Sequence, residues 1–345
     1  MIPIQNIYYM LSYAFQILNE QGYKNIATEQ FNNTAELMAA ILEKGIAIQL
    51  KRGLGKEYIP QTEALSSLRG KIDIAESIKT QSMLRKQLIC TYDEFSVNSI
   101  MNQIIKSTVE LLLRSNISKQ RKKNLRKLMV YFSEVDFIDS YTVNWNVQYN
   151  RNNQTYRMLI SICYLVVKGL LQTQSNGHTK LMDFLDEQRM CRLYEKFILE
   201  YYRKEFKNQI TANASQIPWQ LDNEENSMLP VMQSDIMLQS GEKVLIIDAK
   251  YYEHSTQVQF DKHTLHSGNL YQIFTYVKNK EYELREKDHT VSGMLLYAKT
   301  DEEIYPNNVY QMSGNQIAVR TLDLNLPFDE IASQLNTIAK THFDL

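Results

Sequence analysis

The segment that most constrains the fold is LPVMQSDIMLQSGEKVLIIDAKYY, residues 229–252. Side chains in a strand alternate between faces, so Asp248 and Lys250 share one face. The residues from 244 to 247 are apolar on both faces, as in a central strand that is covered on each side. Charges at the end of such a buried strand are costly unless they have a partner. We therefore expect Asp248 and Lys250 to belong to a functional site.

A second strand is expected directly upstream, because apolar and polar residues alternate there and Ser240-Gly241-Glu242 is the only turn signal between the two runs. If Gly241 and Glu242 form a two-residue loop, Asp235 lies directly opposite Asp248. If the loop is Ser240 and Gly241, Asp235 lies diagonal to Asp248 on the same face. A three-residue loop would place the two carboxylates on opposite faces of the sheet.

Two converging carboxylates indicate a metal site. At a separation of about 5 Å they stay ionised only with a counter-charge nearby, and Mg²⁺ prefers oxygen ligands completed by water. Lys250 can then position or help to deprotonate a water that attacks phosphorus, while the metal neutralises charge on the phosphate. The pattern predicts magnesium-dependent phosphodiester hydrolysis. The alternative is an ordinary surface ion pair between Asp248 and Lys250, which the buried strand and Asp235 disfavour.

A helix is expected from Ser267, which is available as its N-cap. Its apolar stripe has helical spacing and consists of Leu270, Ile273, Phe274 and Val277. Asn269, Gln272 and Tyr276 follow one another at i, i+3 and i+7 on a different face. Gln272 and Tyr276 therefore lie one turn apart and close to each other.

The order of a hairpin Asp, then Asp-x-Lys, then a helix with Gln-x-x-x-Tyr resembles the PD-(D/E)xK nuclease superfamily, in the subset related to the RecB nuclease domain. The resemblance implies that the metal ligands are Asp235, Asp248 and the backbone carbonyl of Ala249. It implies that Lys250 is catalytic and that Gln272 and Tyr276 support the site and the DNA backbone. Pro230 stands five residues before Asp235, so the literal Pro-Asp pair of the motif is absent.

Many such nucleases take a further glutamate from the first helix of the domain. Residues 185–206 have a strongly helical pattern, and Glu195 within LYEKF is the best candidate to reach the metal. Glu187 and Glu200 are weaker candidates. The alternative is that Glu195 is a solvated surface charge that pairs locally.

Three further segments narrow the resemblance. They are IQNIYYMLSYA at residues 4–14, LRGKID at 68–73 and HSGNLYQ at 266–272. Together they resemble the McrC family, the nuclease subunits of McrBC modification-dependent restriction systems, over nearly the whole chain. This resemblance implies that the amino-terminal part docks into a hexameric ring of the GTPase McrB and stimulates GTP hydrolysis. It also implies cleavage of double-stranded DNA after translocation, with the modified cytosine recognised and the GTP bound by McrB.

A chain of 345 residues with 44% hydrophobic residues is long enough for two cores. The softest break is the polar stretch QTQSNGHTK at residues 172–180. We therefore expect an α+β domain at 1–172, for docking to the GTPase ring, and a PD-(D/E)xK nuclease domain at 173–345. The second domain is expected to be α/β, with a mixed central sheet flanked by helices.

Local patterns place elements in both domains. A first helix is expected after Asn6, because Ile7 begins an apolar stripe with helical spacing. Asn33 and Glu36 form a capping signal for a second helix, and a third helix is expected from Ile100. A short strand-like alternation spans residues 68–78. Further strands are expected at 291–298 and 317–324, followed by an amphipathic helix at 328–343. The densest basic run, residues 119–127, spreads around a helix and is typical of a solvated surface.

Other features exclude several classes of protein. Cys90, Cys163 and Cys191 have no zinc or disulfide spacing, which favours a reducing cytoplasm. The apolar run at 158–167 is too short to span a membrane, and no signal peptide is expected. Residues 50–57, LKRGLGKE, depart from a phosphate-binding loop at both ends, so GTP should bind the partner and not this chain. With a net charge of −1, the chain is not basic enough to hold DNA by electrostatics alone, which suits a partner that holds it.

Two other functions remain open from the sequence. The chain could be a regulatory subunit that activates a GTPase ring and carries a vestigial nuclease site, or it could be a nuclease that acts alone. The presence of Asp235, Asp248 and Lys250 together argues against decay of the site.

Overall fold

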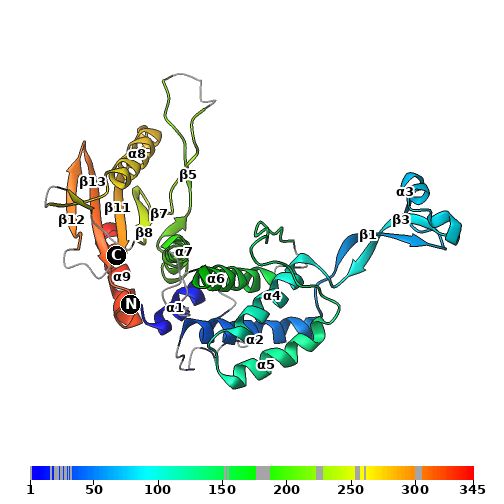
Figure 1. Ribbon diagram of the computed structural model, residues 1–345. Helices are drawn as coiled ribbons and strands as arrows, with labels where there is room; N and C mark the ends of the chain where they lie inside the picture. Colours follow the sequence, from blue (N-terminus) through cyan, green and yellow to red (C-terminus); the bar gives the residue numbers. More distant parts are fainter. Residues whose placement is uncertain are drawn as a thin grey trace. The chain divides into compact units, whose positions relative to one another are not determined.

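The computed structural model describes residues 2–15, 18, 23, 26, 29, 31, 33–150, 153, 155–175, 187–222, 228–252, 257–259, 262–299 and 305–345 (Figure 1). The chain divides into two compact units. The first, which we call the sheet unit, combines Met1–Glu20 with Leu185–Leu345, and the second, the helical unit, is Gln21–Phe184. The expected boundary at 172/173 falls within helix α6 (Tyr156–Ser175), and the helix at residues 4–14 packs with the carboxyl-terminal part of the chain.

A six-stranded mixed sheet forms the centre of the sheet unit, in the order β12-β13-β11-β8-β7-β4. Strands β8, β11 and β13 are parallel, and the other three run antiparallel to their neighbours. The bounds are β4 (Thr211–Asn213), β7 (Ile236–Ser240), β8 (Lys243–Lys250), β11 (Thr290–Ala298), β12 (Asn308–Met312) and β13 (Asn315–Leu322). Two short ribbons accompany the sheet: β5 (Gln216–Ile217) with β6 (Met232–Gln233), and β9 (Gln257–Gln259) with β10 (Lys262–Thr264).

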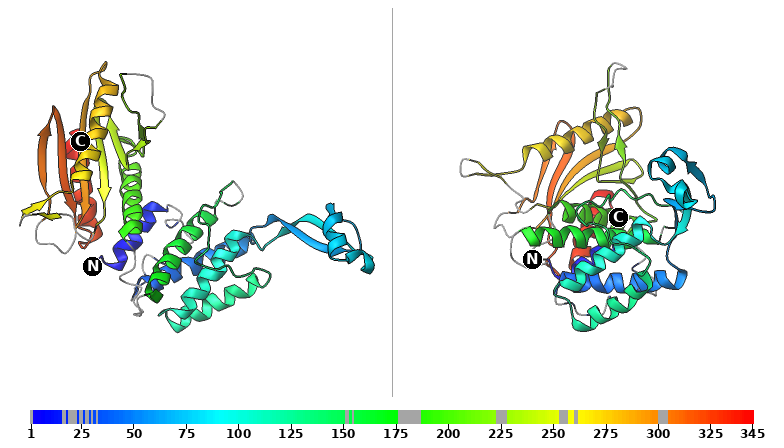
Figure 2. Two further views of the ribbon diagram at one scale, coloured as in Figure 1. Left: turned by 45° about the horizontal axis from the view of Figure 1, so that its top comes forward. Right: turned by 45° about the vertical axis from the view of Figure 1, so that its right-hand side comes forward.

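Helices cover both faces of this sheet (Figures 1 and 2). One face carries α8 (Ser267–Leu284), and the other carries α7 (Glu187–Glu205) and α9 (Phe328–Phe343), with α1 (Ile4–Ala14) packed against α7. The expected mixed sheet flanked by helices is therefore confirmed.

Helix α1 is tied to the end of the chain by specific contacts. The buried side-chain amide of Asn6 donates to the carbonyl oxygens of Leu324 and Leu326, each at 2.8 Å. The ring of Tyr9 stacks on Phe328 with centroids 4.5 Å apart. These contacts join residues that are more than 300 positions apart in the sequence.

The β7–β8 hairpin has the first of the two expected registers. Ser240 pairs with Lys243, so Gly241 and Glu242 form the loop. Gly241 has φ of 57°, a conformation that glycine adopts without a steric penalty. Ile236 pairs with Ile247, and continuing this register by one residue places Asp235 opposite Asp248.

Helix α8 packs closely over β11 because residue 293 has no side chain. Ile273 and Val277 of α8 are fully buried there. A Cβ atom added to Gly293 would lie 2.8 Å from Ile273 Cγ1 and 2.9 Å from Val277 Cγ2. The expected N-cap of α8 was wrong by one residue, because Ser267 already belongs to the helix and His266 precedes it without a side-chain capping hydrogen bond.

The helical unit combines a helix bundle with a small antiparallel sheet, so it is α+β in composition. The bundle consists of α2 (Thr34–Arg52), α4 (Ile100–Arg114), α5 (Lys119–Met129) and α6, with the short turn η4 (Val130–Phe132). The sheet has the order β1-β3-β2, with β1 (Glu57–Leu65), β2 (Lys71–Asp73) and β3 (Leu88–Ser96). Its β1–β3 ribbon extends away from the bundle and carries α3 (Ile74–Lys79) and η3 (Ser82–Arg85) at its far end (Figure 1).

Three sequence expectations in this unit can be compared with the structure. The side chain of Asn33 accepts a hydrogen bond from the backbone of Glu36 and caps α2, as predicted. The strand expected over 68–78 is only three residues long, because Asp73 caps the backbone of Glu76 and starts helix α3. In the basic helix α5, Arg121 is only 16% exposed and pairs with Glu43 of α2 at 2.8 Å, so this member of the basic run joins two helices rather than facing solvent.

Among the described residues, no helix is long and apolar enough to cross a membrane.

Substitution of Gly293 by Ala should destabilise the sheet unit. The added methyl group must displace buried atoms of both α8 and β13, and such overpacking costs about 1 to 3 kcal/mol. Thermal unfolding of the full chain measures this loss. Gly268→Ala is the matched control on the same helix, since nothing lies within 4 Å of its added Cβ. Equal midpoints for Gly293→Ala and the unmodified chain would contradict the packing described here.

Candidate functional site

Three charged side chains meet where β8 ends. Asp248 and Lys250 extend from the same face of β8, and the hairpin register brings Asp235 beside them. The Asp235 carboxylate accepts a hydrogen bond from the backbone nitrogen of Ala249 at 3.0 Å. Lys250 Nζ lies 2.9 Å from Asp248 Oδ1. The structure therefore brings together the three residues that the sequence singles out as catalytic.

The carboxylate of Asp248 is buried and poorly compensated. The residue is only 1% exposed, and neither of its side-chain oxygens has a hydrogen-bond partner among the described residues. Its short-range charged contact is the ion pair with Lys250, whose Nζ lies 2.9 Å from Oδ1. Burial raises the pKa of Asp248 from 3.8 to about 7, Lys250 opposes this rise, and Asp235 adds to it.

Lys250 is held as an ammonium ion. Burial by itself lowers the pKa of Lys250, but the adjoining carboxylate of Asp248 outweighs burial, so the net change is upward. The side-chain carbonyl of Gln272 also accepts a hydrogen bond from Lys250 Nζ, at 3.3 Å. The Gln272 amide in turn donates to the hydroxyl of the buried Tyr276 at 2.9 Å. Gln272 and Tyr276 thus form a polar chain that ends at Lys250.

The donor set at this position fits a hard divalent cation. Two carboxylate oxygens of Asp248 lack hydrogen bonds, Asp235 lies beside them, and the carbonyl of Ala249 belongs to the same strand end. Within the described part of the chain, no three His, Cys, Asp or Glu side chains form a group that could hold a metal. An ion here would have carboxylates from two residues and would complete its shell with a carbonyl and water, as Mg²⁺ commonly does.

Glu195 approaches the site from α7. Burial raises the pKa of Glu195 and the neighbouring Asp235 adds to the rise, so the two carboxylates interact. The thiol of Cys191 donates to Glu195 Oε1 at 3.0 Å. Glu195 and Asp235 also line one cavity of about 400 Å³, together with Arg192. Glu195 is therefore no isolated surface charge, and its role as a metal ligand stays a prediction.

Four neighbours of the site were given no role from the sequence: Cys191, Tyr252, Asn269 and Tyr297. Cys191 lies one helical turn before Glu195, a spacing that could have indicated it. Tyr252 follows Lys250 by two residues on the same strand path, which alternation could also have indicated. The position of Tyr297 depends on β11 pairing with β8, where it is the register partner of Lys250.

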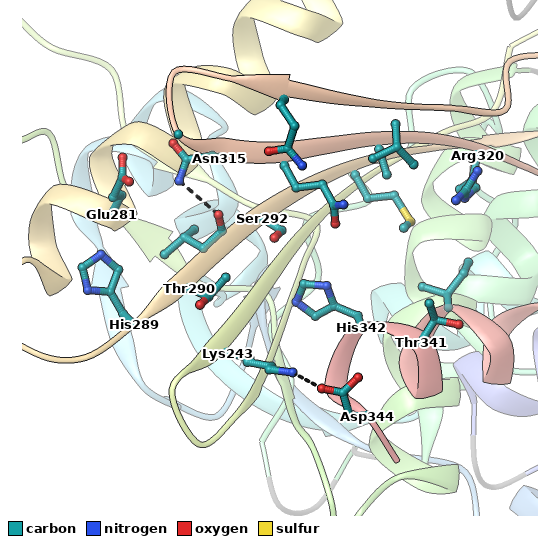
Figure 3. Close-up of a pocket in the computed structure, with 18 of the residues that line it drawn as sticks. Lys243, Glu281, His289, Thr290, Ser292, Asn315, Arg320, Thr341, His342 and Asp344 are labelled. Carbon is teal, nitrogen blue, oxygen red and sulfur yellow. Dashed lines mark hydrogen bonds and ion pairs between the residues drawn. The ribbon is translucent and has the colours of Figure 1, made fainter.

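A second cavity, of about 630 Å³, lies on the other face of the sheet (Figure 3). Its lining includes Lys243 and Ser292, which point away from the face that carries Asp248, and His342 of α9. Lys243 pairs there with Asp344, which also lines the cavity. This cavity is therefore separate from the acidic site.

The family described as McrBC 5-methylcytosine restriction system component matches residues 5–298 of this chain. The chain belongs to this McrBC family. The matched range contains every residue of the acidic site. A relative from Escherichia coli (strain K12), named type IV methyl-directed restriction enzyme EcoKMcrBC, is 30% identical over 342 residues. That alignment covers 97% of this McrBC-family chain and 96% of the relative.

Solved structures show weaker likeness to this McrBC-family chain. One is a refined half-complex from a tetradecameric assembly of Thermococcus gammatolerans McrB AAA+ hexamers with bound McrC; the match has 18% identity and a TM-score of 0.47, covering 97% of this chain and 76% of that one. Another is the Thermococcus gammatolerans McrBC complex, with 21% identity and a TM-score of 0.39, covering 49% of this chain and 55% of that one.

Replacement of Asp248 by Asn should stabilise the metal-free chain in a pH-dependent way. The pKa of this carboxyl is near 3.8 in the unfolded chain and about 7 in the folded chain. Ionisation therefore destabilises the folded chain, by an amount that increases from pH 3.8 to about pH 7 and is constant above pH 7. This pKa shift corresponds to a gain in the free energy of unfolding of at most about 4 kcal/mol for the Asn variant at pH 8. The gain is smaller to the extent that Lys250 loses its attraction to the carboxylate. Unfolding midpoints in EDTA should therefore rise more at pH 8 than at pH 5.

Asp323→Asn is the control with the opposite sign. Burial by itself raises the pKa of Asp323, but hydrogen bonding and ion pairing with Lys299 outweigh burial, so the pKa is lowered. The control should lower the midpoint at pH 8. A midpoint for Asp248→Asn that falls at pH 8 would contradict the uncompensated burial of Asp248.

Proposed function

We propose that this chain is the DNA-cleaving subunit of a McrBC-like restriction complex. Its reaction is magnesium-dependent hydrolysis of phosphodiester bonds in double-stranded DNA that carries modified cytosine, in the cytoplasm. The observation that carries this proposal is the buried carboxylate of Asp248, whose two oxygens have no hydrogen bond, beside Asp235 and Lys250. Membership of the McrBC family supports the choice of DNA as the substrate.

Asp235, Asp248 and the carbonyl of Ala249 would hold the ion. Bound Mg²⁺ supplies neutralisation of phosphate charge and lowers the pKa of water. Asp235 keeps its orientation through the hydrogen bond from the Ala249 backbone, so its second oxygen is available to the site. Arrangement of these ligands on adjacent strands of a buried sheet fixes their separation before any substrate arrives.

Lys250 acts as an electrostatic and positioning group in this proposal. Its raised pKa favours the ammonium form, which donates hydrogen bonds and does not accept a proton. The ammonium can orient the attacking water and stabilise negative charge that builds on the phosphate oxygens. Gln272, supported by Tyr276, restricts the direction in which the lysine side chain extends.

Docking to a hexameric McrB-like GTPase is assigned to the helical unit. At the far end of its ribbon, Ile74, Ile78 and Leu84 are 62%, 63% and 81% exposed. Exposed apolar groups of this kind mark surfaces that bind another protein. We propose that this ribbon end contacts the ring and stimulates GTP hydrolysis. The ring binds the GTP and holds the DNA, for which a chain of net charge −1 has little attraction by itself.

Lys250→Ala should separate cleavage from activation of the partner. In the complex with the GTPase and Mg²⁺, plasmid cleavage should fall by about 100-fold or more, because a preorganised charge at the phosphate is lost. Stimulation of GTP hydrolysis should stay within about twofold. Lys280→Ala is the matched control, since Lys280 pairs with Glu283 on α8 and takes no part in the site. Undiminished cleavage by Lys250→Ala would remove the catalytic assignment and favour a purely regulatory subunit.

Leu84→Glu combined with Ile78→Glu should disrupt docking to the GTPase without changing the acidic site. Charges placed on the apolar ribbon end should abolish co-purification with the GTPase and its stimulation, because the contact would bury unpaired carboxylates. Val130→Glu is the control, since Val130 is 71% exposed elsewhere in the helical unit. Stimulation that survives the double substitution would show that the ring binds another surface.

A further inference from the structure

The contact between Gln272 and Lys250 depends on the position of α8 on the sheet and on the rotation of α8 about its own axis. Lys250 has a long, flexible side chain that can follow Gln272, and the bond from Gln272 to Tyr276 lies within α8 itself. Neither bond fixes the rotation of α8 about its own axis. Some other contact must set the direction in which Gln272 points.

Apolar packing alone does not set it. Ile273 and Val277 hold α8 close to β11 over Gly293. Burial of apolar surface is non-directional, so it fixes the distance of the helix from the sheet more firmly than its rotation. A hydrogen bond with a preferred angle can fix the rotation.

Asn269 provides such a bond beside the site. Its side-chain amide donates to the hydroxyl of Tyr297 at 2.9 Å, and both residues are buried, with Tyr297 fully enclosed. Tyr297 is the register partner of Lys250 in the parallel pair of β11 and β8, so both side chains extend from the same face. The bond therefore connects the first turn of α8 to the strand position next to Lys250.

The other half of the Asn269 side chain is also engaged. Its carbonyl oxygen accepts a hydrogen bond from the hydroxyl of Tyr252 at 3.4 Å. Tyr252 follows Lys250 by two residues, and its ring lies 6.3 Å from that of Tyr297. Asn is suited to this position because its side chain both donates and accepts. The helix is thus tied to two tyrosines next to Lys250, one further along its own chain segment and one on the neighbouring strand.

We propose that Asn269 is a positioning residue for the hydrolysis: its bond to Tyr297 sets the rotation of α8 and so the contact of Gln272 with Lys250. This inference rests on the proposed function and deepens it. Asn269 touches neither the acidic pair nor the substrate in this account. It acts through Gln272, and that dependence makes the inference testable.

Tyr297→Phe removes the hydroxyl and leaves the ring in place. In the complex with the GTPase, kcat for plasmid cleavage should fall by about tenfold, because small misplacements of catalytic groups are costly, while KM for DNA stays within about twofold. Asn269→Leu should produce a similar loss. In a Gln272→Ala background, Tyr297→Phe should lower kcat by less than about twofold more, since residues that act through one another are not additive.

Asn279→Leu is the matched control on the same helix. Asn279 also makes two hydrogen bonds, to Thr275 and from Gln220, away from the site. It should lower the unfolding midpoint and leave kcat unchanged at temperatures below that midpoint.

Two results would overturn the inference while leaving the proposed function intact. One is an unchanged kcat in Tyr297→Phe when Lys250→Ala is inactive. The other is a full tenfold loss from Tyr297→Phe in the Gln272→Ala background. Cleavage that survives Lys250→Ala would instead overturn the proposed function, and the inference with it.

Discussion

The burial of the Asp248 carboxylate is the constraint on which this account depends. A carboxylate that is 1% exposed and has no hydrogen bond to either oxygen is unfavourable in a folded chain, and one lysine compensates for it only in part. The fold retains it at the end of a central strand, directly opposite a second carboxylate. This arrangement is reasonable if the site binds a cation, because the ion supplies the charge that the fold lacks.

The sheet explains how so costly a group is kept in place. Strand β8 is covered by α8 on one face and by α7 and α9 on the other, so its end cannot move independently of the core. Hairpin β7–β8 sets the separation of Asp235 and Asp248, and helix α8 brings Gln272 to Lys250. Asp235, Asp248 and Lys250 therefore lie on a hairpin that is packed on both faces, and Gln272 comes from a helix that packs on the same sheet.

Local patterns in the sequence predicted those parts of the site that lie near one another along the chain. The alternation around Asp248 and the glycine at 241 were enough to place Asp235 opposite Asp248, although they left two registers open. The helical spacing of Gln272 and Tyr276 was likewise sufficient. Binding of a metal and the role of Glu195 stay predictions.

Features that depend on distant pairing could not be read in this way. The position of Tyr297 beside Lys250 follows from the order of parallel strands, which local periodicity does not specify. The position of α1 depends on hydrogen bonds from the Asn6 side chain to the carbonyl oxygens of Leu324 and Leu326. Single side chains also shifted boundaries, as Asp73 did when it capped α3 and shortened the strand expected there.

Anomalous diffraction from crystals of the full chain soaked with Mn²⁺ tests the central claim most directly, because manganese accepts the same oxygen ligands as magnesium and is visible by its anomalous signal. The account predicts one strong peak about 2.2 Å from oxygens of Asp235, Asp248 and the Ala249 carbonyl. A map with no peak among these residues, with Asp248 paired only to Lys250, would contradict it.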